Sequence, residues 1–263
     1  MLKRCFLVAG LVLAASAAQA GDLKSPSTGG LPAVSAFNGK IEGFGGATEN
    51  DGFGGISGSV VIPLAHSYGL QIDGLASSYD GDGLFGVGAH LFWRDPSRAL
   101  FGIYADYGHW GADGGVDVAR VAAEAELYLD RISLEGLAGG AFGDGNDAIF
   151  SSATLALYAT PDLRLSIGHS YLSERHALTL GGEWQVSDRG VSLFTEGRIG
   201  EDDSNAILAG VRLYAAPQPK SLIDRHRQDD PKNHLTDMLG GLGEAELKCK
   251  PPYVLYKGRC VVT

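Results

Sequence analysis

Charged side chains recur at every second position of several short segments in the middle of the chain. Between Val116 and Tyr128, the residues Arg120, Glu124 and Glu126 occupy one set of alternate positions, and mostly apolar residues occupy the other. Successive side chains of an extended strand point to opposite faces, so this spacing gathers the charges on one face. Such a face can line an aqueous passage and set its ion selectivity, or its charges can pair with one another.

The same sorting of the other segments predicts an inward face that carries both signs of charge. Its basic members are Lys40, His90, Arg120, Arg131, Arg164, Arg198 and Arg212. Its acidic members are Glu42, Asp73, Asp106, Glu124, Glu126, Glu135, Glu183 and Glu196. From this set we predict the pore-lining residues Arg120, Arg164, Arg198, Arg212, Asp106, Glu124 and Glu196. The alternative is a filled interior in which these residues pair across the lumen, and it stays open because a barrel of about twelve strands lies between filled and open barrels.

The segment "GHSYLSERH" is the strongest catalytic candidate in the chain. It gathers His169, Ser170, Ser173 and His176 near the end of a predicted strand, where membrane-embedded lipid hydrolases carry a Ser/His site. Neighbouring residues of a strand point to opposite faces, so His169 and Ser170 cannot act together without a bulge. We therefore predict no catalytic residues and no cofactor, and a lipid hydrolase is the third hypothesis for function.

Metal sites receive no support from the spacing of the candidate ligands. The acidic "DGDG" at Asp80 lacks the terminal Glu of a calcium loop, because Leu91 stands in that place. His226 or His234 would have to join two cysteines that lack a paired Cys-x-x-Cys spacing. We predict no metal.

The elements that must hold these side chains are strands within residues 36–215. In "LFGVGAHLFW" the alternate residues Phe85, Val87 and Leu91 form one apolar face, as in a strand with one side against an apolar medium. Cutting the range at its turn residues gives about a dozen strands, an even number as bacterial barrels require. Acidic, glycine-rich breaks lie near Asn50, Asp82, Asp113, Asp144, Glu174 and Asp202. Tighter turns lie near Ser67, Pro96, Asp130, Pro161 and Asp188. If the N-terminus starts in the periplasm, the acidic breaks lie outside the cell and the tight turns lie on the periplasmic side.

Aromatic residues precede most of the tight turns. They are Trp93, Tyr128, Tyr158, Trp184 and Tyr214. Recurrence at the same end of alternate hairpins favours an aromatic girdle at one membrane interface, although aromatic residues are also common in strands generally.

The N-terminus has the pattern of a secretory leader. Lys3 and Arg4 precede an apolar run that ends at Ala18-Gln19-Ala20, which predicts a signal peptide at residues 1–20 and a periplasmic N-terminal segment at residues 21–35. The run is shorter than the roughly 20 residues that a membrane helix requires. Removal of the two leader cations takes the net charge from −10 to about −12, which disfavours a nucleic-acid partner.

The composition changes after Tyr214, where the chain becomes charged and proline-bearing and loses its alternation. We predict a periplasmic tail at residues 216–263, outside the membrane. Cys249 and Cys260 are the cysteines that remain after processing, and an oxidising periplasm favours a disulfide between them.

Together, the leader, the alternating segments and the aromatic residues before the turns resemble the outer-membrane β-barrel, porin-like proteins of Gram-negative bacteria. The resemblance implies an all-β, transmembrane, antiparallel up-and-down barrel in the bacterial outer membrane. It also implies contact with outer-membrane lipids and lipopolysaccharide, and with the barrel assembly machinery. Such families commonly end on an aromatic residue, whereas this chain ends at Thr263 and its matching aromatic, Tyr214, is internal.

Two hypotheses for function lead from this resemblance. The first is a non-enzymatic channel for passive diffusion of ions and small hydrophilic solutes. The second is a closed structural or surface-interaction barrel of the cell envelope, whose tail contacts a periplasmic partner. A measurement of conductance separates them.

Overall fold

The protein was studied as a computed structural model. It describes residues 30–49, 51–111, 115–144, 147–172, 175–201, 205–215, 218–241, 253–256 and 259–262, the last two ranges by their backbone alone. The predicted signal peptide and residues 21–29 of the predicted N-terminal segment lie outside these ranges.

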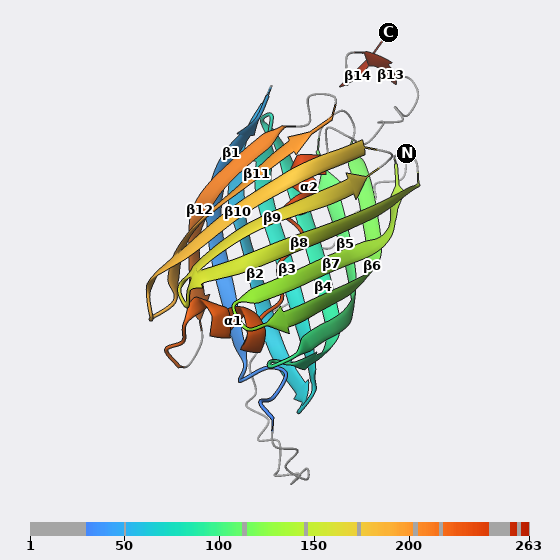
Figure 1. The fold of residues 1–263 in the computed structure, drawn as a ribbon. Helices are drawn as coiled ribbons and strands as arrows, with labels where there is room; N and C mark the ends of the chain where they lie inside the picture. The colour runs from blue at the N-terminus through green and yellow to red at the C-terminus, as the bar shows by residue number, and fades with distance from the viewer. Residues whose placement is uncertain are drawn as a thin grey trace, which may run out of the picture. The chain divides into compact units, whose positions relative to one another are not determined.

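Twelve consecutive strands form one closed antiparallel barrel (Figure 1). They are β1 (Asn38–Thr48), β2 (Gly52–Ala65), β3 (Tyr68–Tyr79), β4 (Asp82–Asp95), β5 (Ala99–Trp110), β6 (Val116–Leu129), β7 (Ile132–Gly143), β8 (Ala148–Thr160), β9 (Leu163–Leu172), β10 (Arg175–Ser187), β11 (Val191–Gly200) and β12 (Ala206–Ala215). Each strand pairs with its sequence neighbours, and β1 pairs with β12 from Gly39 and Ala215 to Thr48 and Ala206. The predicted all-β barrel and its strand number are confirmed.

The turns follow from the residues that the sequence places in them. Between β3 and β4, Asp80 has φ 52° and Gly81 has φ 85°, the two successive positive values that a tight hairpin turn of the right twist requires. Pro63 in β2 has no N–H to donate, and the pairing with β3 shifts register between Pro63 and Ala65. The strand borders are therefore encoded locally.

The two faces of the wall differ in chemistry as the alternation predicts. On β4, the outward-facing Phe85 is 58% exposed, whereas the inward-facing His90 is fully buried. Apolar side chains such as Ile103, Val121 and Ile167 continue the exposed face around the barrel. The exterior is thus apolar, and the charged side chains of the strands lie mostly on the interior face.

Two short helices, α1 (Leu222–Gln228) and α2 (Asp237–Gly241), follow the barrel, and residues 229–239, here called the lumenal segment, run inside it (Figure 1). The Pro231 carbonyl accepts hydrogen bonds from Lys40 Nζ and from Gln71 Nε2, both at 3.3 Å. The His234 carbonyl accepts one from Arg120 Nη2 at 2.9 Å. These donors lie on the inner faces of β1, β3 and β6. The prediction that the whole tail lies outside the barrel is therefore wrong for this segment, because the polar interior supplies partners for its backbone and charges.

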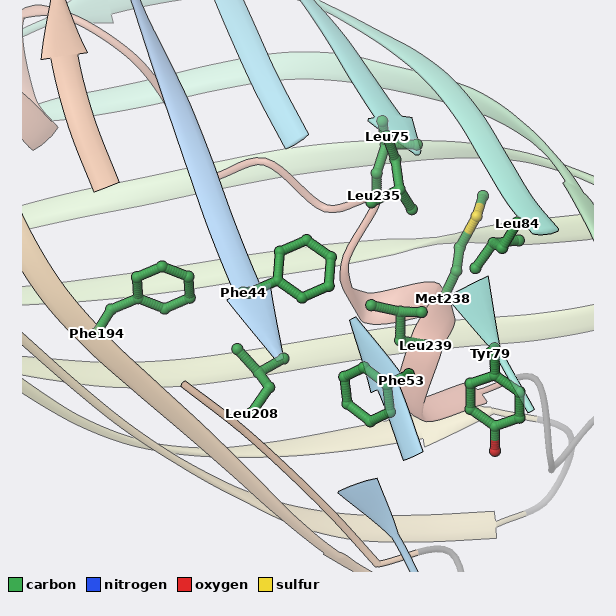
Figure 2. Packing of buried hydrophobic residues seen from close by; sticks show 10 residues of the cluster. All are labelled: Phe44, Phe53, Leu75, Tyr79, Leu84, Phe194, Leu208, Leu235, Met238 and Leu239. Carbon is green, nitrogen blue, oxygen red and sulfur yellow. The ribbon is translucent and has the colours of Figure 1, made fainter. Parts of the chain in front are cut away.

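An apolar cluster anchors the far end of the lumenal segment (Figure 2). Leu235, Met238 and Leu239 come from the segment and α2, and all three are buried. The wall contributes Phe44, Phe53, Leu75, Tyr79, Leu84, Phe194 and Leu208. Burying a leucine side chain contributes roughly 1.5–3 kcal/mol, so the cluster is a substantial part of what holds the segment.

Helix α1 lies at the tight-turn end of the barrel (Figure 1). Ser221 caps it by accepting a hydrogen bond from the Asp224 N–H, and Leu222 is fully buried. His226 contacts the hydroxyls of Tyr158 at 2.9 Å and Tyr214 at 3.0 Å.

The predicted aromatic girdle is wrong for three of its five members. Tyr128, Tyr158 and Tyr214 are buried and face the lumen, where each lies beside α1 residues. Trp184 is 55% exposed on the outer face, and Trp93 stacks on Phe101 with ring centroids 6.0 Å apart. The tyrosine hydroxyls explain the difference, since they reach polar partners inside the barrel.

Two further strands, β13 (Tyr253–Tyr256) and β14 (Arg259–Val262), form an antiparallel pair near the C-terminus. Cys249 lies outside the described residues, and only the backbone of Cys260 is described, so the disulfide stays a prediction. No helix among the described residues is long and apolar enough to cross a membrane.

Candidate lumenal passage

Arg120 and Asp106, both predicted to line a pore, are paired with each other. They lie opposite one another on β6 and β5, and Arg120 Nε is 3.1 Å from Asp106 Oδ1. Asp106 also accepts a hydrogen bond from the Tyr104 hydroxyl at 2.5 Å, and Arg120 donates one to the His234 carbonyl of the lumenal segment. The pair therefore fastens the segment to the wall.

Arg212 joins three strands through two carboxylates. Its Nε is 2.8 Å from Glu42 Oε1 on β1, and its Nη1 forms a second ion pair with Glu183 on β10. The Tyr214 hydroxyl donates to Glu183 at 2.9 Å. Because its partners are buried, Arg212 neutralises two carboxylates that would otherwise be costly to bury.

His90 on β4 lies between two carboxylates, one from β3 and one from β6. Its Nε2 is 2.9 Å from Asp73 Oδ2, and its Nδ1 is 2.8 Å from Glu124 Oε2. Ionised carboxylates can only accept, so this geometry fits an imidazolium that donates from both nitrogens. Glu124, predicted to line the pore, thus holds His90.

Cavities remain beside the lumenal segment among the residues that the structure describes. The acidic-loop cavity, bordered by residues such as Arg198, Tyr171 and Leu239, has an empty volume of about 1370 Å³, part of it open to solvent. The tight-turn cavity, bordered by residues such as Tyr158 and His226, has about 640 Å³. The segment therefore does not fill the lumen.

The two cavities adjoin at a set of mostly charged residues, here called the constriction. They share six lining residues, Glu126, Glu135, Arg164, Gly181, Glu196 and Lys232. Arg164 Nη2 is 2.7 Å from Glu135 Oε1, and Lys232 Nζ on the lumenal segment is 3.0 Å from Asp237 and 3.7 Å from Glu196. Positive and negative groups thus lie together where the two cavities adjoin.

Some of the predicted pore-lining residues border a cavity without a role in the wall networks, and others belong to those networks. Arg164, Arg198 and Glu196 border the acidic-loop cavity, and Arg198 Nη1 donates to Ser170 Oγ at 2.8 Å. Arg120 and Glu124 also border it but are tied into the wall networks, whereas Arg212 borders the tight-turn cavity. Arg131, assigned to the inward face, is instead exposed in the β6–β7 turn and donates to the Ala159 carbonyl at 3.2 Å.

Lys232 is a lining residue that the sequence analysis does not predict, because it belongs to a segment without alternation.

A sequence signal for the lumenal segment does exist. Gly86 and Gly108 are paired on neighbouring strands and occupy lumen-facing positions, and a Cβ on them would lie 3.2 Å from Leu235 Cδ2 and 2.7 Å from Met238 Sδ. Paired glycines on an inward face leave a hollow that another part of the chain can occupy.

The catalytic candidates do not form a serine site in the described part of the chain. His169 Nε2 lies 2.9 Å from His176 Nδ1, and both rings are on exposed residues. Ser170 contacts Arg198 on the inner side, and Ser173 lies outside the described residues. Among the described residues, no group of three or more His, Cys, Asp or Glu is placed to hold a metal ion.

Comparison with known proteins gives no match to a family model and no match among curated protein sequences. Among solved structures, the KdgM porin is 12% identical with a TM-score of 0.50, over 66% of this chain and 98% of the porin. An outer-membrane channel from Pseudomonas putida F1 is 10% identical with a TM-score of 0.49, over 73% and 98% of the two chains. Outer membrane phospholipase A from Escherichia coli is 12% identical with a TM-score of 0.48, over 74% and 95%. In fold, the chain resembles the outer-membrane β-barrel proteins, as its sequence predicts.

Proposed function

We propose that the protein is an outer-membrane, porin-like channel that passes ions and small hydrophilic solutes through the space beside its lumenal segment. The observation that carries the proposal is the pair of cavities that meet at Arg164, Glu135, Glu196 and Lys232. Rings of charged side chains at a narrow point are how channels select among solutes.

The proposed location rests on the outer face of the barrel. Its wide apolar surface, with residues such as Ile103 and Ile149 more than half exposed, would be costly in water and is suited to lipid. A closed sheet leaves no unpaired strand edge, as a membrane interior requires. The predicted signal peptide supports export of the chain.

The constriction would pass solutes that are small and well hydrated. Arg164 and Glu135 occupy one side, and Lys232 from the lumenal segment occupies the other. Paired charges of both signs give a weak net field, so size should limit passage more strongly than charge. A bulky solute would have to displace the lumenal segment.

A closed envelope barrel is the second candidate, and the occupied lumen favours it. The lumenal segment, the Arg120–Asp106 pair and the Arg212 network all fill interior space. In this case the two cavities would hold water without being a through passage. A lipid hydrolase has less support, since His169 contacts another histidine.

Single-channel current in a planar bilayer distinguishes the two candidates. We expect the refolded mature chain to give small, discrete conductance steps. Arg120→Ala with Arg198→Ala should shift the steps toward cation selectivity, because two positive charges leave the lumen. Arg131→Ala is the matched control, since it removes a positive charge from an exposed turn. A folded, heat-modifiable barrel without current would show that the lumen is closed.

A further inference from the structure

The lumenal segment enters the barrel at the end where the tight turns lie. The Leu222 N–H donates to Asp162 Oδ1 at 3.1 Å, and the Ile223 N–H donates to the Pro161 carbonyl at 3.0 Å. Arg225 Nη2 donates to the Asp188 carbonyl at 2.9 Å. These contacts fix α1 to the β8–β9 and β10–β11 turns.

The segment reaches the opposite end of the barrel at α2. Met238 and Leu239 pack in the cluster that contains Tyr79 and Leu84, which flank the acidic turn between β3 and β4 (Figure 2). Phe53, one residue into β2 after the acidic β1–β2 connection, belongs to the same cluster. The chain has therefore crossed the lumen from the tight-turn end to the acidic-loop end (Figure 1).

Contacts along the whole route hold this crossing in place. Asp230 pairs with Lys40, the Pro231 carbonyl accepts from two wall side chains, and the His234 carbonyl accepts from Arg120. Leu235 is fully buried. Ion pairs, hydrogen bonds and apolar packing therefore hold the segment to the wall at several points, from Asp230 to Leu235, along its path through the lumen.

The charge of the remaining chain suits the end that it reaches. From residue 242 to Thr263 the sequence contains the basic residues Lys248, Lys250, Lys257 and Arg259 and the acidic residues Glu244 and Glu246, so basic side chains are in excess by two. The connections at the end where α2 lies are acidic, with Asp80, Asp144 and Glu201 among their residues. Attraction between a basic segment and an acidic rim favours the exit over a return through the lumen.

We propose that the barrel carries its own C-terminus across the membrane and displays residues 242–263, with their two cysteines, at the acidic-loop face. In an outer membrane with the tight turns in the periplasm, that face is the cell surface. This placement reverses the periplasmic tail that composition alone predicts, and it adds a display function to the proposed channel. The inference rests on the proposed location, which the control tags below test separately.

The test is the accessibility of an epitope tag fused after Thr263 to an antibody on intact and on permeabilised cells. Matched controls carry the same tag between Asp144 and Gly145, in an acidic connection, or between Asp130 and Arg131, in a tight turn. We expect the C-terminal tag and the Asp144 tag to bind antibody on intact cells, and the Asp130 tag to bind only after permeabilisation.

Two other results of the tag experiment would contradict a proposal. A C-terminal tag that requires permeabilisation, beside an exposed Asp144 tag, overturns the display proposal and leaves the channel proposal standing. An Asp144 tag that also requires permeabilisation overturns the proposed location and orientation, and surface display with them. In a second measurement, Leu235→Asp with Leu239→Asp should reduce C-terminal exposure while the barrel stays heat-modifiable, because the anchor at the exit is lost. Unchanged exposure in that variant would contradict the route through the lumen.

Discussion

Lys40 on β1 forms an ion pair with Asp230 of the lumenal segment, and both side chains are almost completely buried. Lys40 Nζ also donates to the neighbouring Pro231 carbonyl at 3.3 Å. The two partners are 190 positions apart in the chain, so the contact joins the first strand of the barrel to the segment that follows the last one. A buried pair of this kind contributes little net stability but makes the loss of either partner costly.

Lys40→Met should therefore release the lumenal segment. Leaving Asp230 buried without its partner costs about 3–5 kcal/mol, which favours undocking of the segment over unfolding of the barrel. We expect larger single-channel steps and faster trypsin cleavage at residues 220–232. Lys40→Met with Asp230→Asn removes both charges and should restore much of the protection. Equal cleavage in the wild type and Lys40→Met would show that the pair does not hold the segment.

Gly108→Phe should displace α2 from the lumen. A Cβ at Gly108 would already lie 2.7 Å from Met238 Sδ, and a ring would occupy the space that Met238 fills. The control is Gly74→Phe, since a Cβ there meets nothing within 4 Å. Cross-linking between cysteines placed at Met238 and Leu84 should fall in Gly108→Phe and persist in Gly74→Phe. Persistence in both variants would mean that a ring at position 108 is accommodated without displacing α2, which would contradict the close packing of Met238 against Gly108.

Arg212→Ala should lower the thermal stability of the barrel. Removal of its guanidinium leaves Glu42 and Glu183 buried without their cation, a loss of about 3–5 kcal/mol. The temperature at which the folded band disappears in electrophoresis should fall. Arg131→Ala, which removes an exposed arginine, should leave it unchanged. A normal transition in Arg212→Ala would show that the two carboxylates find other partners.

Much of the barrel can be predicted from the sequence, because turn residues and strand alternation depend only on neighbouring residues. Asp80 and Gly81 can adopt positive φ, so they end one strand and start the next, and Val211 and Arg212 take opposite faces because a strand has period two. The same rule puts Tyr214 on the Arg212 face. The girdle prediction failed because it used position before a turn and ignored this parity.

The lumenal segment could not be predicted from its own residues, because they carry no local signal, and the paired glycines of the wall indicate a hollow but not its occupant. The partners of the segment are distant in sequence, as the 191 positions between Lys40 and Pro231 illustrate. Its own residues have neither a strand nor a helix period. They are also charged and proline-bearing, as in a solvent-exposed tail. The pairings of Arg120, Glu124 and Arg212 were missed for a related reason. A face assignment gives the direction of a side chain but not its partner.

Substitutions at the constriction should change ion selectivity in opposite directions. Glu135→Gln leaves Arg164 without its carboxylate and should favour anions, whereas Arg164→Gln leaves Glu135 and should favour cations. Both glutamines keep the size and polarity of the site, so the single-channel conductance should change less than the reversal potential in a salt gradient. Glu201→Gln, on an exposed acidic connection, is the control and should shift the reversal potential little at an ionic strength where the Debye length is about 8 Å. If the two constriction variants shift the potential in the same direction, or not at all, the current does not pass between the two cavities. The passage would then have to lie elsewhere in the lumen.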